Sequence, residues 1–289
     1  MTEKEMIDYI KISFPDLKIN AVQVNRDGWD NTIIIINQEI VFRFPKNNDI
    51  AWNVVVETKL LKGLHKLEPE ITIPDYTILR DENDELKCVY YRFIKGVSVK
   101  EGRINLTKKN AQILGDFLTK LHSMKPDLKL NSVQTPDYWN NLYHSVHNKI
   151  FPYLNEKQKN EINDTFLSFL NSNFSSSIKK SVIHGDLTAS NIICDGSGMI
   201  NGIIDFTDAQ LGDPAFDFAG FYWNFGPDFT KDVLSYYNGA ESAESLYTRV
   251  KSFYGLQPIF HELLYAIQHD ITIDWETALK KFFKLKGNG

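Results

Sequence analysis

Three polar residues between positions 181 and 208 have types and spacings that could form a catalytic site. Asp186 ends a His-Gly-Asp sequence, Asn191 comes five positions later, and Asp205 follows a short apolar segment. Phosphoryl transfer from a nucleoside triphosphate needs a carboxylate that orients a hydroxyl and accepts its proton, and it needs neutralised phosphate charge. Carboxylate and amide oxygens are also ligands that Mg²⁺ prefers. We therefore expect Asp186 to act as the catalytic base, and Asn191 and Asp205 to bind Mg²⁺.

A His-Gly-Asp sequence alone also fits an ordinary acidic turn that contains a hydrogen-bonded histidine. Its combination with Asn191 and with the Ile-Asp-Phe sequence at Asp205 favours the catalytic interpretation. His184 itself is expected to brace the loop through hydrogen bonds and not to transfer protons.

A short hairpin must bring the three groups together. Strand-like segments at residues 191–194 and 199–205 flank an Asp-Gly turn, which places Asn191 at one end of the hairpin and Asp205 at the other. The loop that carries Asp186 precedes this hairpin directly. The three side chains are therefore expected around one site.

The rest of the chain divides into a strand-rich and a helical part. Periodicity and turn residues predict a helix at 3–14, strands at 21–26, 32–37 and 39–45, a helix at 50–67, and strands at 76–80 and 86–94. Helical patterns follow at 111–122, 136–150 and 156–170, and again after the hairpin to the end of the chain. The expected fold class is α+β, with an N-terminal lobe at 1–95, a hinge near 91–96 and a helical lobe at 96–289.

The segment from Ser181 to Asp208 resembles the catalytic and metal loops of the protein-kinase-like fold, in the form found in aminoglycoside and choline kinases. In those families His-Gly-Asp or His-Asn-Asp is followed by Asn or His five residues after the aspartate, and then by Ile-Asp-Phe or Ile-Asp-Trp. The order of the two lobes extends the resemblance over nearly the whole chain. Residues 41–46 and the Asp-Trp pair at 274–275 look most similar to aminoglycoside 2″-phosphotransferases.

This resemblance implies a nucleotide site in the N-terminal lobe. Arg43 takes the position of the family's phosphate-binding lysine, with Glu57 as its helix partner, although Arg43 could also be an outward-facing charge and Lys46 an alternative phosphate contact. The turn at 27–31 takes the place of a phosphate-covering turn, although it also fits an ordinary hairpin turn. The residues expected to bind the nucleotide are Gly28, Asn31, Arg43, Glu57, Arg92, Phe93, Ile94 and Ile204.

Acceptor recognition is expected in the helical lobe. Residues 213–217 resemble a segment whose aspartates brace the family's catalytic loop, and acidic and aromatic residues gather near the C-terminus. Carboxylates beside aromatic faces bind ammonium groups through ion pairing and cation–π attraction. The residues expected to bind the acceptor are Asp217, Glu262, Asp270, Asp274 and Trp275. The alternative is a solvated acidic helix face with Trp275 packed in the core.

Composition narrows the class of protein. The 289 residues carry a net charge of −5 and no apolar run of membrane-spanning length, which argues against nucleic acid and membrane partners. Two distant cysteines and a polar N-terminus favour a cytoplasmic protein, expected as a monomer or weak dimer.

The expected activity is Mg²⁺-dependent transfer of the γ-phosphate of ATP or GTP to a hydroxyl of a cationic small molecule, with an aminoglycoside as first candidate. The alternatives are a metabolic kinase of the same fold acting on choline, an amino sugar or homoserine, and a nucleotide-binding module without catalysis. The acceptor, the hydroxyl and the choice between ATP and GTP stay open.

Overall fold

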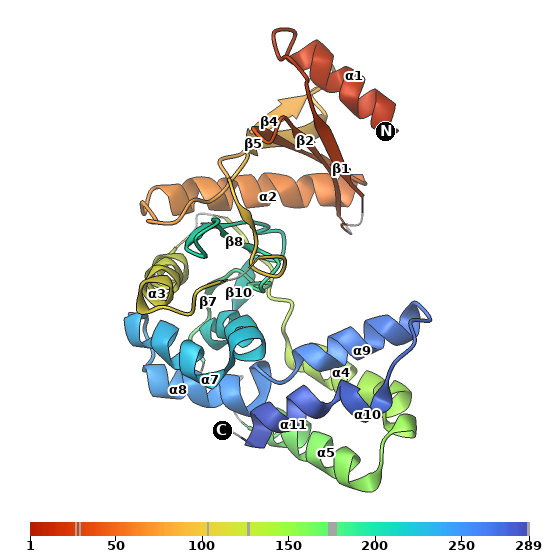
Figure 1. Cartoon of the computed structure of the whole chain (residues 1–289), viewed down its shortest axis with the longest axis vertical. Helices are drawn as coiled ribbons and strands as arrows, with labels where there is room; N and C mark the ends of the chain where they lie inside the picture. The colour runs from red at the N-terminus through yellow and green to blue at the C-terminus, as the bar shows by residue number, and fades with distance from the viewer. Residues whose placement is uncertain (27, 29, 103, 126–127, 173–177, 288–289) are drawn as a thin grey trace.

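The computed structural model describes residues 1–289 except 27, 29, 103, 126–127, 173–177 and 288–289. Figure 1 shows an N-terminal region built around a sheet, and below it a larger region built mainly of helices. The α+β fold class expected from the sequence is confirmed. Helix α2 lies between the sheet and the helical region and so borders both (Figure 1).

The N-terminal region contains one antiparallel sheet with the strand order β1-β2-β3-β5-β4. Its elements are α1 (Glu3–Ser13), β1 (Val22–Asn25), β2 (Asn31–Ile36), β3 (Ile40–Pro45), α2 (Asn48–His65), β4 (Thr77–Arg80) and β5 (Leu86–Arg92). Residues 37–39 join β2 to β3, and the two central turn residues, Asn37 and Gln38, have φ values of 55° and 53°. Positive φ at both turn residues is typical of the tight hairpin turns that match strand twist. The hairpin predicted here is confirmed.

Strand β3 alternates between two apolar clusters. Phe42 and Phe44 pack with Met6 and Ile10 of α1 on one face of the sheet. Val41 belongs to the large cluster on the other face, which continues through α2 into the helical region. Because successive side chains of a strand point to opposite faces, Arg43 must point toward α2, as Val41 does.

The C-terminal region contains short strands within a helical body. Its strands are β6 (Val97–Ser98), β7 (Ser181–Ile183), β8 (Ile192–Cys194), β9 (Ile200–Ile203) and β10 (Gln210–Gly212). Its α-helices are α3 (Lys108–Ser123), α4 (Pro136–Lys149), α5 (Glu156–Leu170), α7 (Ala219–Tyr236), α8 (Ala243–Arg249), α9 (Pro258–Gln268), α10 (Trp275–Ala278) and α11 (Lys280–Gly287). In the described part of the chain, no helix combines the length and apolar character needed to cross a membrane.

The predicted hairpin is present as the antiparallel pair β8 and β9. Strand β9 ends at Ile203, so Asp205 lies in the following loop and not in the strand where the sequence pattern placed it. The pairs β6–β8 and β7–β10 were not predicted. Their strands have only two or three residues, too few to show a period of two.

Candidate active site

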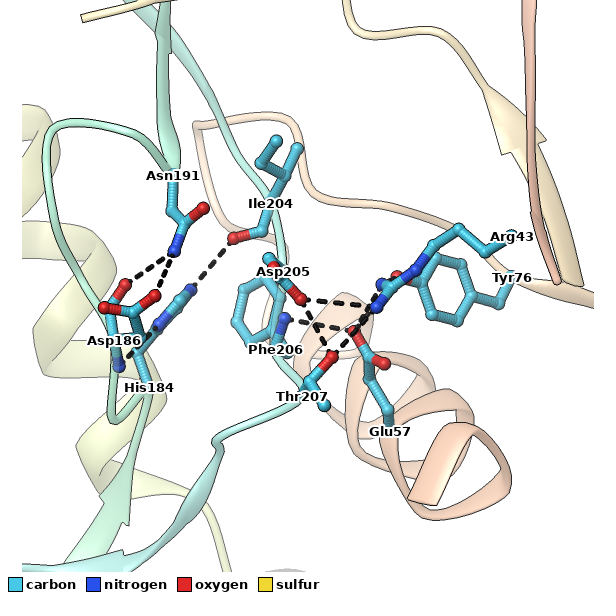
Figure 2. Close-up of polar contacts among 10 residues, drawn as sticks. All are labelled: Arg43, Glu57, Tyr76, His184, Asp186, Asn191, Ile204, Asp205, Phe206 and Thr207. Carbon is cyan, nitrogen blue, oxygen red and sulfur yellow. Dashed lines mark hydrogen bonds and ion pairs between the residues drawn. The ribbon is translucent and has the colours of Figure 1, made fainter. Parts of the chain in front are cut away.

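The loop between β7 and β8 holds Asp186 in a fixed orientation. The side-chain amide of Asn191 donates one hydrogen bond to the main-chain oxygen of Asp186 and another to its Oδ2 atom, each 2.8 Å long (Figure 2). The main-chain N–H of Asp186 donates to Nδ1 of His184 at 3.3 Å, so Nε2 of this ring carries the proton and donates to the Ile204 oxygen at 3.1 Å. Burial lowers the pKa of His184, which favours the neutral ring. The histidine thus braces the loop.

Asp217 braces the backbone of the loop that carries Asp186. Its carboxylate accepts hydrogen bonds from the N–H groups of His184, at 2.8 Å, and Gly185, at 3.0 Å, and lies 3.0 Å from Nε2 of His122. Gly185 has φ of 82°, and a Cβ atom there would lie 2.2 Å from the Asp208 oxygen, so the loop needs glycine. Asp217 is only 1% exposed. Its expected contact with the acceptor is corrected to a buried bracing position.

Asp205 stands at the turn after β9. Its φ of 63° is in the left-handed region, which re-aims the chain toward β10. Its carboxylate side chain is 49% exposed, and Oδ1 accepts from the Thr207 hydroxyl at 2.8 Å and from Nη2 of Arg43 at 3.3 Å. In Figure 2 the Asn191 carbonyl oxygen lies on the side away from Asp186. Asn191 and Asp205 thus each carry a side-chain oxygen of a kind that can bind a metal ion.

These two oxygen donors fit Mg²⁺ by ligand type. Among the described residues, no group of three or more His, Cys, Asp and Glu side chains could hold a metal by itself. A magnesium ion at Asn191 and Asp205 would therefore take its remaining ligands from phosphate oxygens and water, as this cation commonly does.

Arg43 lies in a buried polar network that joins β3, α2 and the loop after β9. It is 4% exposed, and its guanidinium donates to Glu57 at 3.0 Å, to Thr207 at 2.9 Å and to the Tyr76 hydroxyl (Figure 2). Glu57 Oε1 also accepts from Tyr76 at 2.9 Å and from the Phe206 N–H at 3.0 Å. The alternative of an outward-facing Arg43 is excluded.

Lys46 has a different position. Its ammonium donates to the main-chain oxygens of Arg26, at 3.1 Å, and of Gly28. It therefore fastens the turn between β1 and β2, part of which lies outside the described residues. Asn31 opens β2 and is buried.

The remaining residues expected at the nucleotide lie near the connection from β5 to β6. Arg92 is exposed at the end of β5, and Phe93 donates its N–H to the main-chain oxygen of Glu39, in the turn between β2 and β3, at 2.8 Å. Ile94 is buried against Gly202 of β9, where an added Cβ would lie 2.5 Å from its side chain. Ile204 is half-buried and directly precedes Asp205.

A cavity of about 810 Å³ opens beside Asp186. It lies between α2 of the N-terminal region and the helices α4, α7 and α9, and the loop that carries Asp186 forms one wall. Of the residues predicted as site residues, Glu57, Asp186 and Glu262 line it. Glu262 accepts a hydrogen bond from Nε1 of Trp223 at 3.1 Å.

The other C-terminal residues predicted for the acceptor are not brought to this cavity. Asp274 caps α10, accepting from the Glu276 N–H at 3.1 Å and from the Thr277 hydroxyl at 2.6 Å. The Trp275 ring stacks on Tyr153, with centroids 4.5 Å apart. Asp270 is exposed just after α9. Capping and stacking account for two of them and the third faces solvent, so their contact with the acceptor stays a prediction.

Asp208 is a cavity residue that sequence reasoning missed. Burial, together with the nearby carboxylates of Asp208 and Asp205, raises the pKa of Asp186 to about 7. The pKa of Asp208 is itself raised by desolvation and by Asp205. The spacing of three residues after Asp205 was visible in the sequence. The sequence does not show that the turn after Asp205 brings Asp208 back to the loop that carries Asp186.

Comparison with known proteins places these features in a family. Residues 21–253 match the family model described as "Phosphotransferase enzyme family". A GDP complex of aminoglycoside 2′-phosphotransferase-IIIa is similar in structure, with a TM-score of 0.77 and 23% identity, covering 100% of this chain and 99% of the other. Macrolide 2′-phosphotransferase from Brachybacterium faecium gives a TM-score of 0.67 at 17% identity, covering 96% and 98% of the two chains.

A curated relative matches only locally. An uncharacterized protein of Bacillus subtilis, YcbJ, is 42% identical over 60 residues, which is 21% of this chain and 20% of that protein. The match thus spans about a fifth of the length of this relative. The family model covers most of the chain and includes the loops that carry Asp186 and Asp205 and the buried Arg43 network. The chain therefore belongs to the phosphotransferase enzyme family, with the kinase-like fold of the aminoglycoside phosphotransferases.

Proposed function

We propose that this protein transfers the γ-phosphoryl group of a nucleoside triphosphate to a hydroxyl group of a small molecule bound in the cavity beside Asp186. The observation that carries the proposal is the Asp186 carboxylate, which Asn191 holds in place at the wall of a cavity large enough for a small-molecule acceptor. Membership of the phosphotransferase family supports the reaction type.

In this proposal Asp186 orients the acceptor hydroxyl and accepts its proton as the phosphoryl group is transferred. Asn191 and Asp205 would hold Mg²⁺, which would supply neutralising charge at the phosphate oxygens. Arg43 keeps the sheet, α2 and the metal loop in one arrangement through Glu57 and Thr207. The chain thereby fixes the distance between the nucleotide phosphates and the cavity.

The first candidate for the acceptor is an amine-bearing hydroxyl compound of the aminoglycoside type, with ATP or GTP as phosphoryl donor. The carboxylates of Asp208 and Glu262 line the cavity and could pair with ammonium groups. Solved structures of similar fold include a GDP and kanamycin complex of one aminoglycoside 2″-phosphotransferase and a gentamicin complex of another. Acceptor-dependent release of nucleoside diphosphate, screened with ATP and with GTP over aminoglycosides and smaller amino alcohols, tests this proposal. Diphosphate release that no acceptor stimulates would contradict it.

Asp205→Asn is expected to remove most of the Mg²⁺ dependence of nucleotide binding, because the amide lacks the charge of the carboxylate. Calorimetry with and without Mg²⁺ measures the factor by which the metal raises nucleotide affinity. This factor should be at least about tenfold smaller in the variant, a difference of ~1.4 kcal/mol. Asp195→Asn is the matched control, since Asp195 lies in the turn of the same hairpin and bonds only within that turn among the contacts described. If Mg²⁺ raises nucleotide affinity by the same factor in Asp205→Asn as in wild type, Asp205 does not bind the metal.

The substitution Asp208→Asn should shift the acid limb of the pH–activity profile, the range in which activity rises with pH. The proposed base works only when ionised, so kcat/KM for the acceptor should fall as pH drops below the pKa of Asp186. Because the Asp208 carboxylate raises that pKa, Asp208→Asn should move the limb to lower pH. Glu262→Gln removes a carboxylate from the α9 side of the cavity and should leave the limb in place. A limb that stays fixed in Asp208→Asn would show that the titrating group is not Asp186.

A further inference from the structure

Two large apolar side chains remain exposed at the cavity. Trp52, on α2 in the N-terminal region, is 69% exposed, and Val133, before α4 in the helical region, is 53% exposed. Both line the cavity that contains Asp186. A tryptophan is seldom left so open to water, and exposed apolar surface around a cavity is characteristic of ligand contact.

The deeper wall of the cavity is also aromatic. Tyr138 of α4 and Trp223 of α7 line it, and Tyr138 packs edge to face on Trp139. Trp223 is buried, and its indole N–H is already bonded to Glu262. These contacts, with the Lys281 ammonium 4.1 Å from the centroid of the Trp223 ring, hold both rings in place and make this wall aromatic and rigid.

The charge of the lining does not favour a polycation. Among the residues described, the lining carries Lys100 and Lys129 as well as carboxylates. Glu57 is paired with Arg43, and Asp186 faces the reacting hydroxyl in the proposed function. Two carboxylates, Asp208 and Glu262, are left for ammonium groups, and the second also accepts from Trp223. The lining therefore suits an acceptor with one or two positive charges.

We propose that Trp52 is an acceptor-binding residue contributed by the N-terminal region, and that the acceptor is an amphipathic hydroxyl compound with an extended apolar face. This inference rests on the proposed phosphotransferase function, but it replaces the polycationic aminoglycoside, the first acceptor candidate given above, with an amphipathic compound. The apolar face lies between Trp52 on one side of the cavity and Val133 with Tyr138 on the other. The hydroxyl points to Asp186, and a single ammonium group pairs with Asp208 or Glu262.

Helix α2 then connects the two ligand sites. Trp52 and Val56 are four residues apart and both line the cavity, while the next residue, Glu57, holds Arg43 and the Phe206 N–H of the metal loop. An acceptor that contacts Trp52 restrains the helix that also positions the metal loop. Acceptor and nucleotide should therefore raise each other's affinity by the same factor, as linkage requires.

The test uses two probes of opposite character with the whole chain. Erythromycin carries one dimethylammonium group and a large apolar ring, whereas kanamycin is a polycation with little apolar surface. Wild-type protein should bind erythromycin in calorimetry, with and without nucleotide, more tightly than kanamycin. Trp52→Ala should weaken erythromycin binding by about tenfold or more, as loss of a tryptophan anchor does. Nucleotide affinity measured without acceptor should stay within about twofold.

Two control variants distinguish loss of the Trp52 contact with the acceptor from a general disturbance of the fold. Trp52→Phe should retain most of the erythromycin affinity, because it keeps an aromatic face. Ile12→Ala removes another exposed apolar side chain, 79% exposed on α1, and should change neither ligand's affinity. In wild type, each ligand should bind more tightly when the other is present. This coupling of affinities should be lost in Trp52→Ala and kept in both control variants.

The outcomes distinguish this inference from the proposed function. If kanamycin is phosphorylated and Trp52→Ala leaves its KM unchanged, the role of Trp52 and the amphipathic acceptor are overturned while the phosphotransferase activity stands. If erythromycin binds through Trp52 but neither probe is phosphorylated, the binding inference stands and the proposed activity loses its support. Failure of erythromycin to bind the wild-type protein overturns the inference directly.

Discussion

Asp186→Asn is expected to lower turnover by roughly 10²- to 10⁴-fold, which is the usual contribution of a general base. The substitution keeps the size of the side chain, and an amide oxygen can still accept the hydrogen bond from Asn191, which is 2.8 Å long in the structure. The loop and the nucleotide affinity should therefore change little. Steady-state turnover and nucleotide calorimetry, made on the same preparation, measure the two effects separately.

Asp208→Asn is the matched control for this experiment, because it removes a carboxylate from the same cavity without removing the proposed base. At a pH well above the acid limb it should retain far more turnover than Asp186→Asn. If Asp186→Asn works within a few-fold of wild type, Asp186 is not the base, and the assignment of the loop as catalytic fails.

Arg43→Ala is expected to destabilise the protein by about 3–5 kcal/mol, because it leaves the carboxylate of Glu57 buried without its ion-pair partner. Denaturant unfolding monitored by circular dichroism measures this. Arg43→Lys should lie between wild type and alanine, since lysine keeps the charge but cannot bond Glu57 and Thr207 with one planar fork. Nucleotide KM should rise in both variants.

Two further variants test the cause of this loss. The double variant Arg43→Met with Glu57→Gln removes both charges and should recover part of the stability, since a buried pair is often replaceable as a unit. Lys46→Ala removes a more exposed ammonium bonded to two main-chain oxygens and should cost at most about 1 kcal/mol. Greater damage from Lys46→Ala than from Arg43→Ala would mean that Lys46, which follows β3, and not Arg43 within it, is the important cation of this segment.

The parts of the site that depend on local spacing could be predicted from the sequence. The bonds from Asn191 to Asp186 span five residues, and the turn at Asn37 and Gln38 depends on two. The inward direction of Arg43 also follows from strand alternation, once Val41 is known to face α2. In each of these cases the constraint lies within a few residues, so the residue types carry it.

The parts that depend on how distant elements pack could not be predicted in this way. Nearness in sequence placed Asp274 and Trp275 with Glu262, but α10 begins a separate turn of helix, and Trp275 finds Tyr153 instead of the cavity. Trp52 was overlooked for the opposite reason, because its helix belongs to the N-terminal region while its side chain lines a cavity shared with the helical one. Helical periodicity shows which face is apolar, but not which distant element that face meets.

The central claim is that a hydroxyl compound in the cavity receives the phosphoryl group with the help of Asp186. Transfer of label from γ-labelled ATP or GTP to an acceptor, with the product identified by mass spectrometry, tests it most directly. The account predicts an acceptor that gains one phosphoryl group on a hydroxyl with the wild-type protein and Mg²⁺, and almost none with Asp186→Asn. Label that appears only in free phosphate, or labelled acceptor formed equally well by Asp186→Asn, would contradict it.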